Sequence, residues 1–576
     1  MSGGAATLTD GARSGGPAGV PSNRFLARAA LLTAAFTAAG ALLGLLRDQL
    51  LARTFGAGPD SDAFLVAWTV PEFASTLLIE DAMALVLVPA FSRALALRAE
   101  AGAAGPDPVL GLVRTTLPRT AVGTAAAAAL VAAAAPLLVP LLAPGLPEQR
   151  LAVDCTRLTA TCVLSFALAG YFSAALRAHG RYLAPAAIYV AYNTGIITAV
   201  VLLGPAWGVR AAAAGVAAGG ALMALVQAPS LVGRLRRRAT GAADRDRGGD
   251  RERGGDRDRA AAAGGVVLAL VAPVIVFAVG RQSQVLVERF LAAPLPAGAI
   301  SHLNYAQKVA QLPMVLSLML CTVSFPVIAR AIAAGDREAA RRRAERDLLL
   351  AGVIVLVGAA TVAAAAPQIV GLLFQRGAFD AADTAATASV MRVYALGLLG
   401  HALVSALGRC YFSASRPLWF PAVAMGLGVA ANAALGALWV DRWGAAGIAL
   451  ANAAGITLTA AVLLAGTGRR QVPLSARTVV AGLARLVAAA AAATTAGRLC
   501  ASWTAHPLLG AVLAAAAVLA VFVLAAHALR APLVPHLTRV ALRTPLPRPL
   551  SRRHRHAPTP DAPLDRDVPL RRHRPG

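Results

Sequence analysis

Ionisable side chains lie inside or beside long apolar stretches of this chain, where a lipid bilayer makes them costly. Each such group costs about 2.5–3.5 kcal/mol at the centre of a membrane helix, so its presence indicates a function. Cations in this setting can clamp a pyrophosphate, and acids can hold sugar hydroxyls or a cation, or keep the arginines apart. We therefore predict an amphoteric substrate-binding cavity. Its expected residues are Arg47, Asp48, Arg53, Asp62, Glu80, Asp81 and Lys308.

Other interpretations of these charges stay open at this point. Lys308 is the only lysine among 54 basic side chains, and it could extend from its apolar stretch to the membrane interface. Glu80 and Asp81 could form an intramembrane salt bridge that only fixes helix packing. Arg47 and Asp48 could form a local ion pair at the interface.

Apolar blocks position these charges. The chain is 57% hydrophobic and 14% charged, which is too apolar for a soluble protein of 576 residues. The blocks are about 20 residues long, the length that crosses a bilayer core. We predict an all-α polytopic membrane protein with about 14 transmembrane helices. The expected spans are residues 25–46, 63–88, 120–143, 153–176, 182–204, 208–232, 262–285, 303–328, 348–373, 386–410, 417–440, 444–466, 478–499 and 507–529.

The net charge of +26 comes almost entirely from arginine. These arginines lie in the loops and tails between apolar blocks, which argues for a membrane protein and against a nucleic-acid-binding one. The set of alternate loops that carries more arginines should face the cytoplasm, so both termini are expected on the cytoplasmic side of the cell membrane. The five cysteines have no zinc or redox spacing, and we find no catalytic triad or phosphate-binding loop. We therefore expect a transporter without a cofactor or metal.

The two halves of the chain repeat each other at a nearly constant offset of 236 to 240 residues. The matched segments are Val88–Ala94 with Phe325–Ala331, Tyr171–Ala174 with Tyr411–Ala414, and Trp207–Gly208 with Trp443–Gly444. Such repeats predict two six-helix lobes with a substrate site between them and alternating access.

The duplication divides the chain into six parts. We expect a disordered amino-terminal segment, a first lobe, a charged cytoplasmic linker, a second lobe, two further helices and a disordered basic tail. Their boundaries are residues 1–24, 25–233, 234–260, 261–470, 471–530 and 531–576.

Three motifs carry a family resemblance. The first comprises Gly44–Asp48, Phe55–Gly58, Asp62–Phe64, Pro71, Glu80 and Val88–Pro89. The second comprises Tyr305–Lys308 and Gln311–Pro313, and the third Leu373–Asp380 and Asp383–Thr384. With these motifs the chain resembles the MviN/MurJ family of lipid II flippases, within the superfamily of multidrug, oligosaccharidyl-lipid and polysaccharide exporters.

The resemblance implies a function in peptidoglycan biosynthesis. Two lobes would alternate between cytoplasm-open and periplasm-open states around a cationic cavity, through which the lipid II head group crosses. The last two helices would form a groove for the polyprenyl tail. By position, Arg47 matches a family arginine, Asp62 and Glu80 match family acids, and Lys308 stands where the family has an essential arginine.

The chain also departs from the family pattern. Ala41, Ser75 and Thr76 stand where the family has arginines, Asp81 replaces a glycine, and Gln307 replaces an aspartate. The segment Ser413–Pro417 lacks an expected aspartate, which argues against a sodium site that uses this region. About half of the expected cavity cations are therefore missing, so the chain resembles a divergent member of the family.

Three functions remain to be separated. The first is a flippase that transports lipid II or a related undecaprenyl-pyrophosphate glycolipid and is in contact with the membrane lipids. The second is an exporter of another undecaprenyl-linked glycan or of an amphipathic metabolite, which the missing arginines favour. The third is a non-transporting scaffold that contacts cell-wall synthesis or division proteins through the basic linker and tail.

Overall fold

The chain is helical throughout its described part, and no strand occurs among those residues. The computed structural model describes residues 23–101, 107–243, 256–314, 317, 336–412, 418–467 and 474–531. At residues 23–30, 80–85, 101, 234–243, 256–271 and 337 it describes the backbone alone. The predicted all-α class is confirmed, while the expected disordered segment 1–24 and tail 531–576 lie almost wholly outside the described residues.

The first half of the chain forms one bundle of helices. Its elements are α1 (Asn23–Phe55), α2 (Pro59–Ala67), α3 (Thr69–Ser75), a π-helical turn η1 (Thr76–Asp81), α4 (Ala82–Ala101), α5 (Pro108–Leu142), α6 (Gln149–Ala160), α7 (Cys162–Ala178), α8 (Leu183–Ala186), α9 (Ile188–Trp207) and α10 (Arg210–Ala243). We call this bundle the first lobe.

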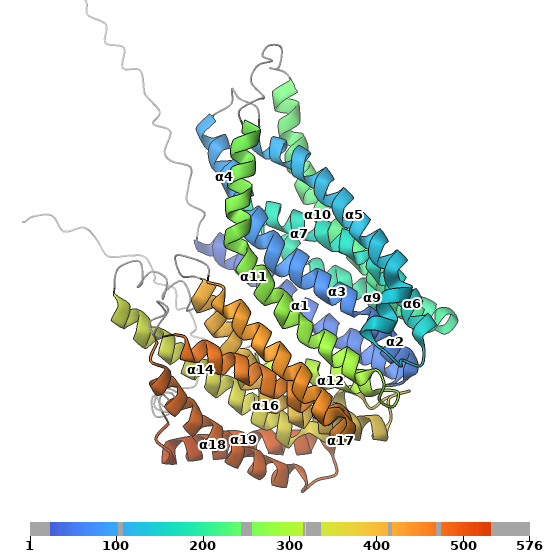
Figure 1. The fold of residues 1–576 in the computed structure, drawn as a ribbon, viewed down its shortest axis with the longest axis vertical. Coiled ribbons are helices and arrows are strands. Elements are labelled where there is room, and N and C mark those ends of the chain that lie inside the picture. The colour runs from blue at the N-terminus through green and yellow to red at the C-terminus, as the bar shows by residue number, and fades with distance from the viewer. Residues whose placement is uncertain are drawn as a thin grey trace, which may run out of the picture.

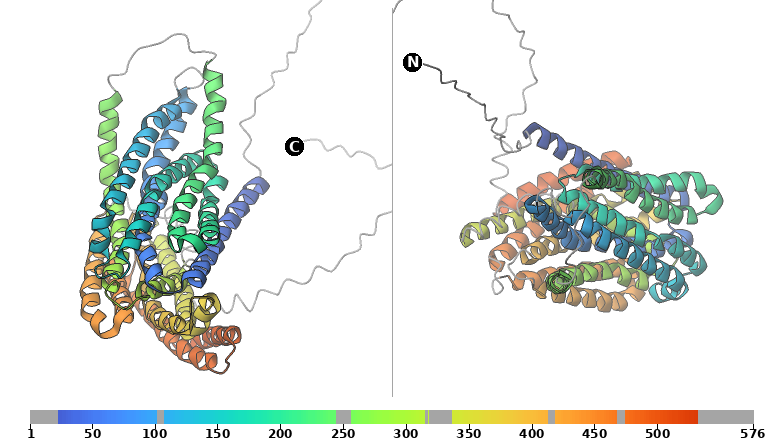
Figure 2. Two further views of the ribbon diagram at one scale, coloured as in Figure 1. Left: turned by 90° about the vertical axis from the view of Figure 1, so that its right-hand side faces the viewer. Right: turned by 90° about the horizontal axis from the view of Figure 1, so that it is seen from above.

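The second half forms another bundle beside the first (Figure 1). Its elements are α11 (Asp256–Ala292), α12 (Ala299–Ala310), α14 (Arg337–Ala364), α15 (Ala366–Phe374), α16 (Ala381–Phe412) and α17 (Phe420–Ala465). We call it the second lobe. In Figure 2, α10 and α11 extend beyond both bundles at one end of the molecule, where the linker between the lobes begins and ends.

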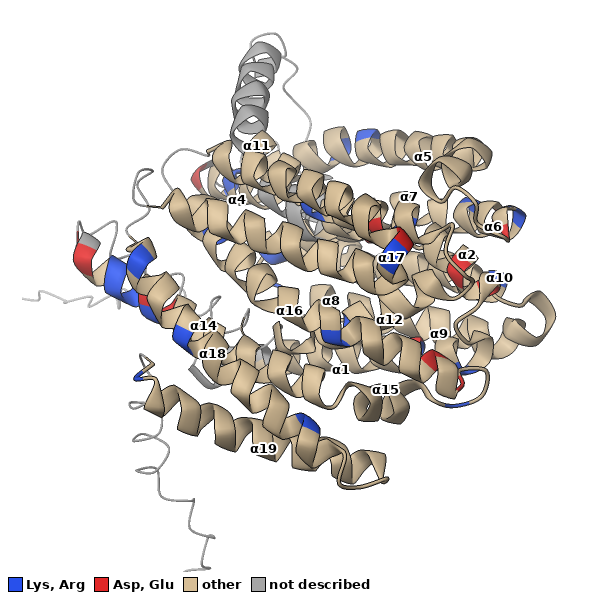
Figure 3. Cartoon of the chain, turned by 60° about the horizontal axis from the view of Figure 1, so that its bottom comes forward, with Lys and Arg blue, Asp and Glu red and all other residues tan. Residues whose placement is uncertain are grey.

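Eleven of the described helices are long and apolar enough to cross a membrane. One of them, Phe420–Ala465, contains two consecutive helices that meet at Gly444, as the predicted spans 417–440 and 444–466 require. Charged residues are sparse on these helices (Figure 3). The prediction of a polytopic membrane protein is confirmed.

Two predicted spans have the wrong shape. The first was expected to end at residue 46, but α1 continues to Phe55 and includes the paired Arg47 and Asp48. The second, 63–88, is a succession of α2, α3, η1 and α4 rather than one helix. Its π-helical turn carries one extra residue per turn, which is a common feature of functional sites.

The internal duplication reappears in the backbone. Gly208 and Gly444 both have a left-handed φ, of 57° and 53°, and similar ψ values of −142° and −135°. Each stands between two consecutive membrane helices, at the position where the sequence repeat aligns them. Such angles favour glycine, which explains why the repeat retains it. The matched segment 325–331 lies outside the described residues.

Small residues bring the helices of the first lobe close together around the site. A Cβ atom at Gly40 would lie 2.9 Å from Tyr189 Cβ, so only a glycine lets α9 approach α1 at this point. The same contact brings Asn193 of α9 against Gly44 of α1. Close packing through small residues is typical of membrane helices.

The last two helices, α18 (Ala476–Ala501) and α19 (Pro507–Ala528), pack against the second lobe at its outer edge (Figure 1). Glu345 of α14 accepts a hydrogen bond of 2.8 Å from the Ser475 backbone N–H, directly before α18. Gly497 of α18 faces Val518 of α19 and Ala364 of α14. These contacts attach the last two helices to the second lobe.

Candidate functional site

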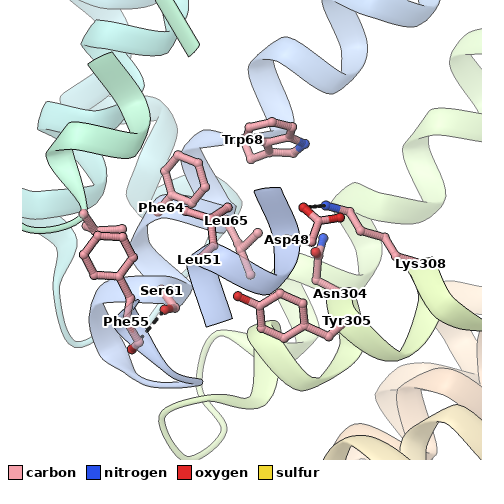
Figure 4. Close-up of a pocket in the computed structure, with 11 residues that line it drawn as sticks. Asp48, Leu51, Phe55, Ser61, Phe64, Leu65, Trp68, Asn304, Tyr305 and Lys308 are labelled. Atoms are coloured by element: carbon pink, nitrogen blue, oxygen red, sulfur yellow. Dashed lines mark hydrogen bonds and ion pairs between the residues drawn. The ribbon is translucent and has the colours of Figure 1, made fainter. Parts of the chain in front are cut away.

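An ion triad connects the two lobes. Asp48 Oδ1 accepts hydrogen bonds from Arg47 Nε at 3.0 Å and Arg47 Nη2 at 2.8 Å. The same oxygen lies 3.4 Å from Nζ of Lys308, which α12 of the second lobe supplies (Figure 4). Arg47 and Asp48 are only 9% and 7% exposed. One carboxylate oxygen thus pairs with two cations from different lobes, in a setting where unpaired charges are costly.

Both cations of the triad lie over the Trp68 ring. The Arg47 guanidinium carbon lies 4.8 Å from the Trp68 ring centroid, and Lys308 Nζ lies 5.3 Å from it. Both distances are within the range of cation–π attraction. The indole therefore helps to keep two like charges close together beneath the cavity.

The remaining arm of Arg47 is held by the first lobe. Its Nη1 donates to Asn193 Oδ1 at 2.9 Å. The Asn193 amide nitrogen in turn donates to the backbone oxygens of Gly40 and Tyr189 at 3.0 and 2.9 Å. These bonds fix the orientation of the amide, so the guanidinium is positioned before any ligand arrives.

A cavity of about 490 Å³ opens between the lobes beside the triad. Arg47 and Trp68 belong to its wall, and Lys308 and Asp48 line a smaller hollow next to it. Glutamines are prominent in the wall contributed by the second lobe. They are Gln282, Gln284, Gln307 and Gln311. Amides can donate and accept hydrogen bonds, so this wall is suited to sugar hydroxyls and amide groups.

Two further charged side chains line the cavity, Glu72 from α3 and Arg281 from α11. Ser75 and Thr76, at the positions where the family resemblance led us to expect arginines, also face it. Glu72 and Arg281 were not among the predicted site residues. Their signal in the sequence was the same as that of Lys308, a charge within an apolar stretch.

The lobes meet below the triad, where Asp62 lies between them. Its Oδ2 accepts from the Gly298 backbone N–H at 2.7 Å, and its Oδ1 accepts from the Ser301 N–H and hydroxyl at 2.8 and 2.6 Å. Asp62 is 4% exposed and does not line the cavity described here. A first-lobe carboxylate therefore binds the amino-terminal end of α12 in the second lobe. We call this region the closed end.

Arg53 also lies at the closed end rather than at the cavity. Its side chain is exposed, and its backbone oxygen accepts a hydrogen bond of 2.9 Å from the Ala378 N–H of the second lobe. A Cβ atom at Gly377 would approach that oxygen to 2.3 Å. A Cβ atom at Gly298 would approach the Ala57 backbone oxygen to 2.6 Å. Glycines thus allow direct backbone contact between the lobes.

The predicted site residues therefore separate into three groups. Arg47, Asp48 and Lys308 come together at the cavity, while Asp62 and Arg53 lie at the closed end. The side chains of the other two predicted residues, Glu80 and Asp81, lie outside the described residues; their backbone belongs to the end of η1, which begins at the cavity-lining Thr76.

A polar network continues from the cavity into the second lobe. His401 lines the cavity, and its Nε2 lies 3.3 Å from Asn452 Oδ1. Asn452 Nδ2 donates to Glu288 Oε1 at 2.7 Å and to Gln284 Oε1 at 3.3 Å. Glu288 is 2% exposed. Within the described part of the chain, no three His, Cys, Asp or Glu side chains are grouped to hold a metal ion.

Comparisons with known proteins agree with this arrangement. The family model described as "Lipid II flippase MurJ" matches residues 51–518. A relative from Rhizobium meliloti named "Probable lipid II flippase MurJ" is 28% identical over 492 residues, covering 81% of this chain and 85% of the relative. A relative from Burkholderia cenocepacia named "Lipid II flippase MurJ" is 27% identical over 462 residues, covering 77% and 84%.

Solved structures share the fold. The structure titled "Lipid II flippase MurJ, inward closed conformation" superposes with a TM-score of 0.69 at 18% sequence identity. That match covers 89% of this chain and 100% of the other. An inward-facing multidrug resistance transporter of the MATE family superposes with a TM-score of 0.60 at 14% identity, covering 77% and 98%. These likenesses support the two-lobed architecture with 14 membrane helices.

Proposed function

Since the chain belongs to the lipid II flippase family MurJ, we propose that it moves lipid II from the inner to the outer leaflet of the cytoplasmic membrane by alternating access. It is a multi-pass membrane transporter and not an enzyme. The observation that carries the proposal is the ion triad of Arg47, Asp48 and Lys308, which lies beside a cavity between two lobes that are closed at one end.

The triad is suited to the anionic part of the cargo. A pyrophosphate that enters beside Trp68 would offer several oxygens to Arg47 and Lys308, which now share one oxygen of Asp48. Charge-assisted hydrogen bonds to phosphate are among the strongest that a protein makes. The glutamine wall would receive the sugar–peptide head group. The polyprenyl tail would stay outside, along α18 and α19.

The closed end would face the periplasm. The connections at the opposite end are richer in arginine, and the helix ends beside them carry Arg98 in α4, Arg177 in α7 and Arg341 in α14. Positive loops stay on the cytoplasmic side, which supports cytoplasmic termini and a cavity that loads from the cytoplasm. The linker 234–260 and tail 531–576 are the segments that we propose for contacts with cell-wall synthesis or division proteins.

Complementation tests the proposal directly. The essential lipid II flippase of a host is depleted, this chain is expressed alone, and the lipid II head group reachable from outside the cell is measured. We expect restored exposure, and loss of that exposure in Lys308→Ala. The matched control is Arg210→Ala, which removes a cation paired with Asp154 on the surface, and it should stay active.

Each other outcome points to a different function. If the inserted chain restores no exposure, lipid II is not its cargo, and the absent arginines at Ser75 and Thr76 favour another undecaprenyl-linked glycan or an amphipathic metabolite. If Lys308→Ala transports normally, the triad is not the phosphate site. If a deletion within residues 244–255 abolishes the function of the chain in cells while another flippase still transports lipid II normally, a scaffold is favoured.

A further inference from the structure

Glu72 is a carboxylate in the cavity wall whose role the transport of an anion does not explain. It lies on α3, is half-buried, and lines the same cavity as Arg47. Among the described residues, no hydrogen bond or ion pair reaches its carboxylate; only its backbone is bonded, through N–H to Trp68 O at 3.1 Å and through O to Gln282 Nε2 at 3.4 Å.

Three other acids around the site, whose side chains the structure describes, have partners. Asp48 is bound by Arg47 and Lys308, Asp62 by the beginning of α12, and Glu288 by Asn452. Glu72 is therefore the acid of the described cavity wall that remains available to a ligand. An acid at this depth is expensive, and polar groups that stay unpaired in the membrane are generally functional.

Its position relative to the triad is defined by one helical turn. Glu72 follows Trp68 by four residues and bonds back to it through the backbone, so the two side chains lie on the same face of the α2–α3 segment. Trp68 lies under Arg47 and Lys308. The cations Arg47 and Lys308 thus lie at Trp68, and the unpaired carboxylate of Glu72 lies one helical turn away. The amide of Gln282 is next to Glu72.

A purely anionic cargo would be repelled by Glu72, whereas a cargo that also carries a cation would be attracted. We propose that Glu72 binds a primary ammonium group on the cargo head group while Arg47 and Lys308 bind its phosphates. The inference rests on the proposed function and adds a specificity to it. A peptide head group can carry such an ammonium on the side chain of a diamino acid, and a carboxylate with a neighbouring amide is a suitable receptor for it.

Binding of three probes to the full chain in lipid nanodiscs tests the proposal. The probes are lipid II with a free amine on its peptide, the same lipid II with that amine acetylated, and undecaprenyl pyrophosphate without a head group. We expect the native chain to bind the free-amine form about tenfold more tightly than the acetylated form, the ratio typical of one hydrogen bond to a charged group.

The variant Glu72→Gln should bind both lipid II forms equally, and it should bind undecaprenyl pyrophosphate at least as tightly as the native chain does, because a negative charge in the cavity wall is removed. Glu72→Asp should keep part of the preference. The matched control is Glu100→Gln, which changes an exposed glutamate at the end of α4 and should keep the full preference. Normal binding of undecaprenyl pyrophosphate reports that each variant is folded.

The possible failures are distinct. A native chain without preference between the two lipid II forms, or a Glu72→Gln variant that keeps the preference, overturns the ammonium site and leaves the flippase proposal standing. A native chain that binds undecaprenyl pyrophosphate but neither form of lipid II contradicts the proposed cargo itself, and the ammonium site with it.

Discussion

Asp48→Asn is the most informative single substitution, because one oxygen of Asp48 holds both cations of the triad. Asparagine keeps the shape and the acceptor oxygen but removes the charge. Lys308 Nζ lies 3.4 Å from that oxygen. At an effective dielectric constant of about 20, a pair at this distance attracts by about 5 kcal/mol before desolvation. Removing one partner from a buried pair costs about 3–5 kcal/mol in net stability.

We therefore expect Asp48→Asn to lower the free energy of unfolding by about 3 kcal/mol. In a chain of 576 residues this corresponds to a decrease in melting temperature of about 3 °C, from the usual unfolding entropy per residue. The assay is thermal unfolding of the purified full chain in nanodiscs. The matched control is Asp154→Asn: Asp154 pairs with Arg210 at 2.8 Å, but its side chain is 42% exposed. An exposed pair contributes about 1 kcal/mol or less.

A double-mutant cycle with Lys308→Met isolates the contact between the lobes. Asp48 and Lys308 share a direct ion pair, so the two substitutions should be non-additive by about 1–2 kcal/mol. Additive effects, or a decrease for Asp48→Asn no larger than that for Asp154→Asn, would show that the triad does not link the lobes. The reasoning about the site would then be wrong.

Three further predictions concern the closed end and the last helices. Asp62→Asn should weaken three hydrogen bonds to Gly298 and Ser301 and raise the labelling rate, from outside the cell, of a cysteine placed at Ala57; an unchanged rate contradicts this. Gly298→Ala should raise that labelling rate more than the control Gly444→Ala. Both glycines have a positive φ, but of the two only Gly298 faces the backbone of the other lobe, so equal rates would refute the contact. Glu345→Ala should lower the melting temperature by about 1 °C by removing the bond to the Ser475 N–H before α18, more than Glu338→Ala on the exposed face of α14.

The three residues of the triad are among the site residues predicted from the sequence, because each carries its own signal. Arg47, Asp48 and Lys308 are charges in apolar stretches, and such charges face protein or water rather than lipid. Asn193 and Trp68 carry no comparable signal. The importance of Asn193 depends on how closely α9 approaches α1, which the missing Cβ of Gly40 decides. A distance between helices of that kind cannot be predicted from composition or periodicity.

Asp62 illustrates a second limit of sequence reasoning. We expected it in the cavity with the other acids, but it binds backbone N–H groups at the beginning of α12. Every helix begins with such free N–H groups whatever its residues are, so the sequence does not indicate which of them will bind an acid. A sequence identifies an acid that needs a partner, but the three-dimensional arrangement decides whether the partner is a ligand, a cation or a helix end.

The triad also suggests how cargo binding could open the closed end. A ligand shifts a conformational equilibrium only when it binds the two states with different affinity. In the described state, Arg47 and Lys308 both pair with Asp48, which keeps the two lobes together at that level. A phosphate that competes for these cations replaces an attraction between lobes with attractions to the ligand, so the lobes lose one link while the cargo is bound. Asp62 and the backbone contact at Ala378 would then be links that remain to be broken at the closed end.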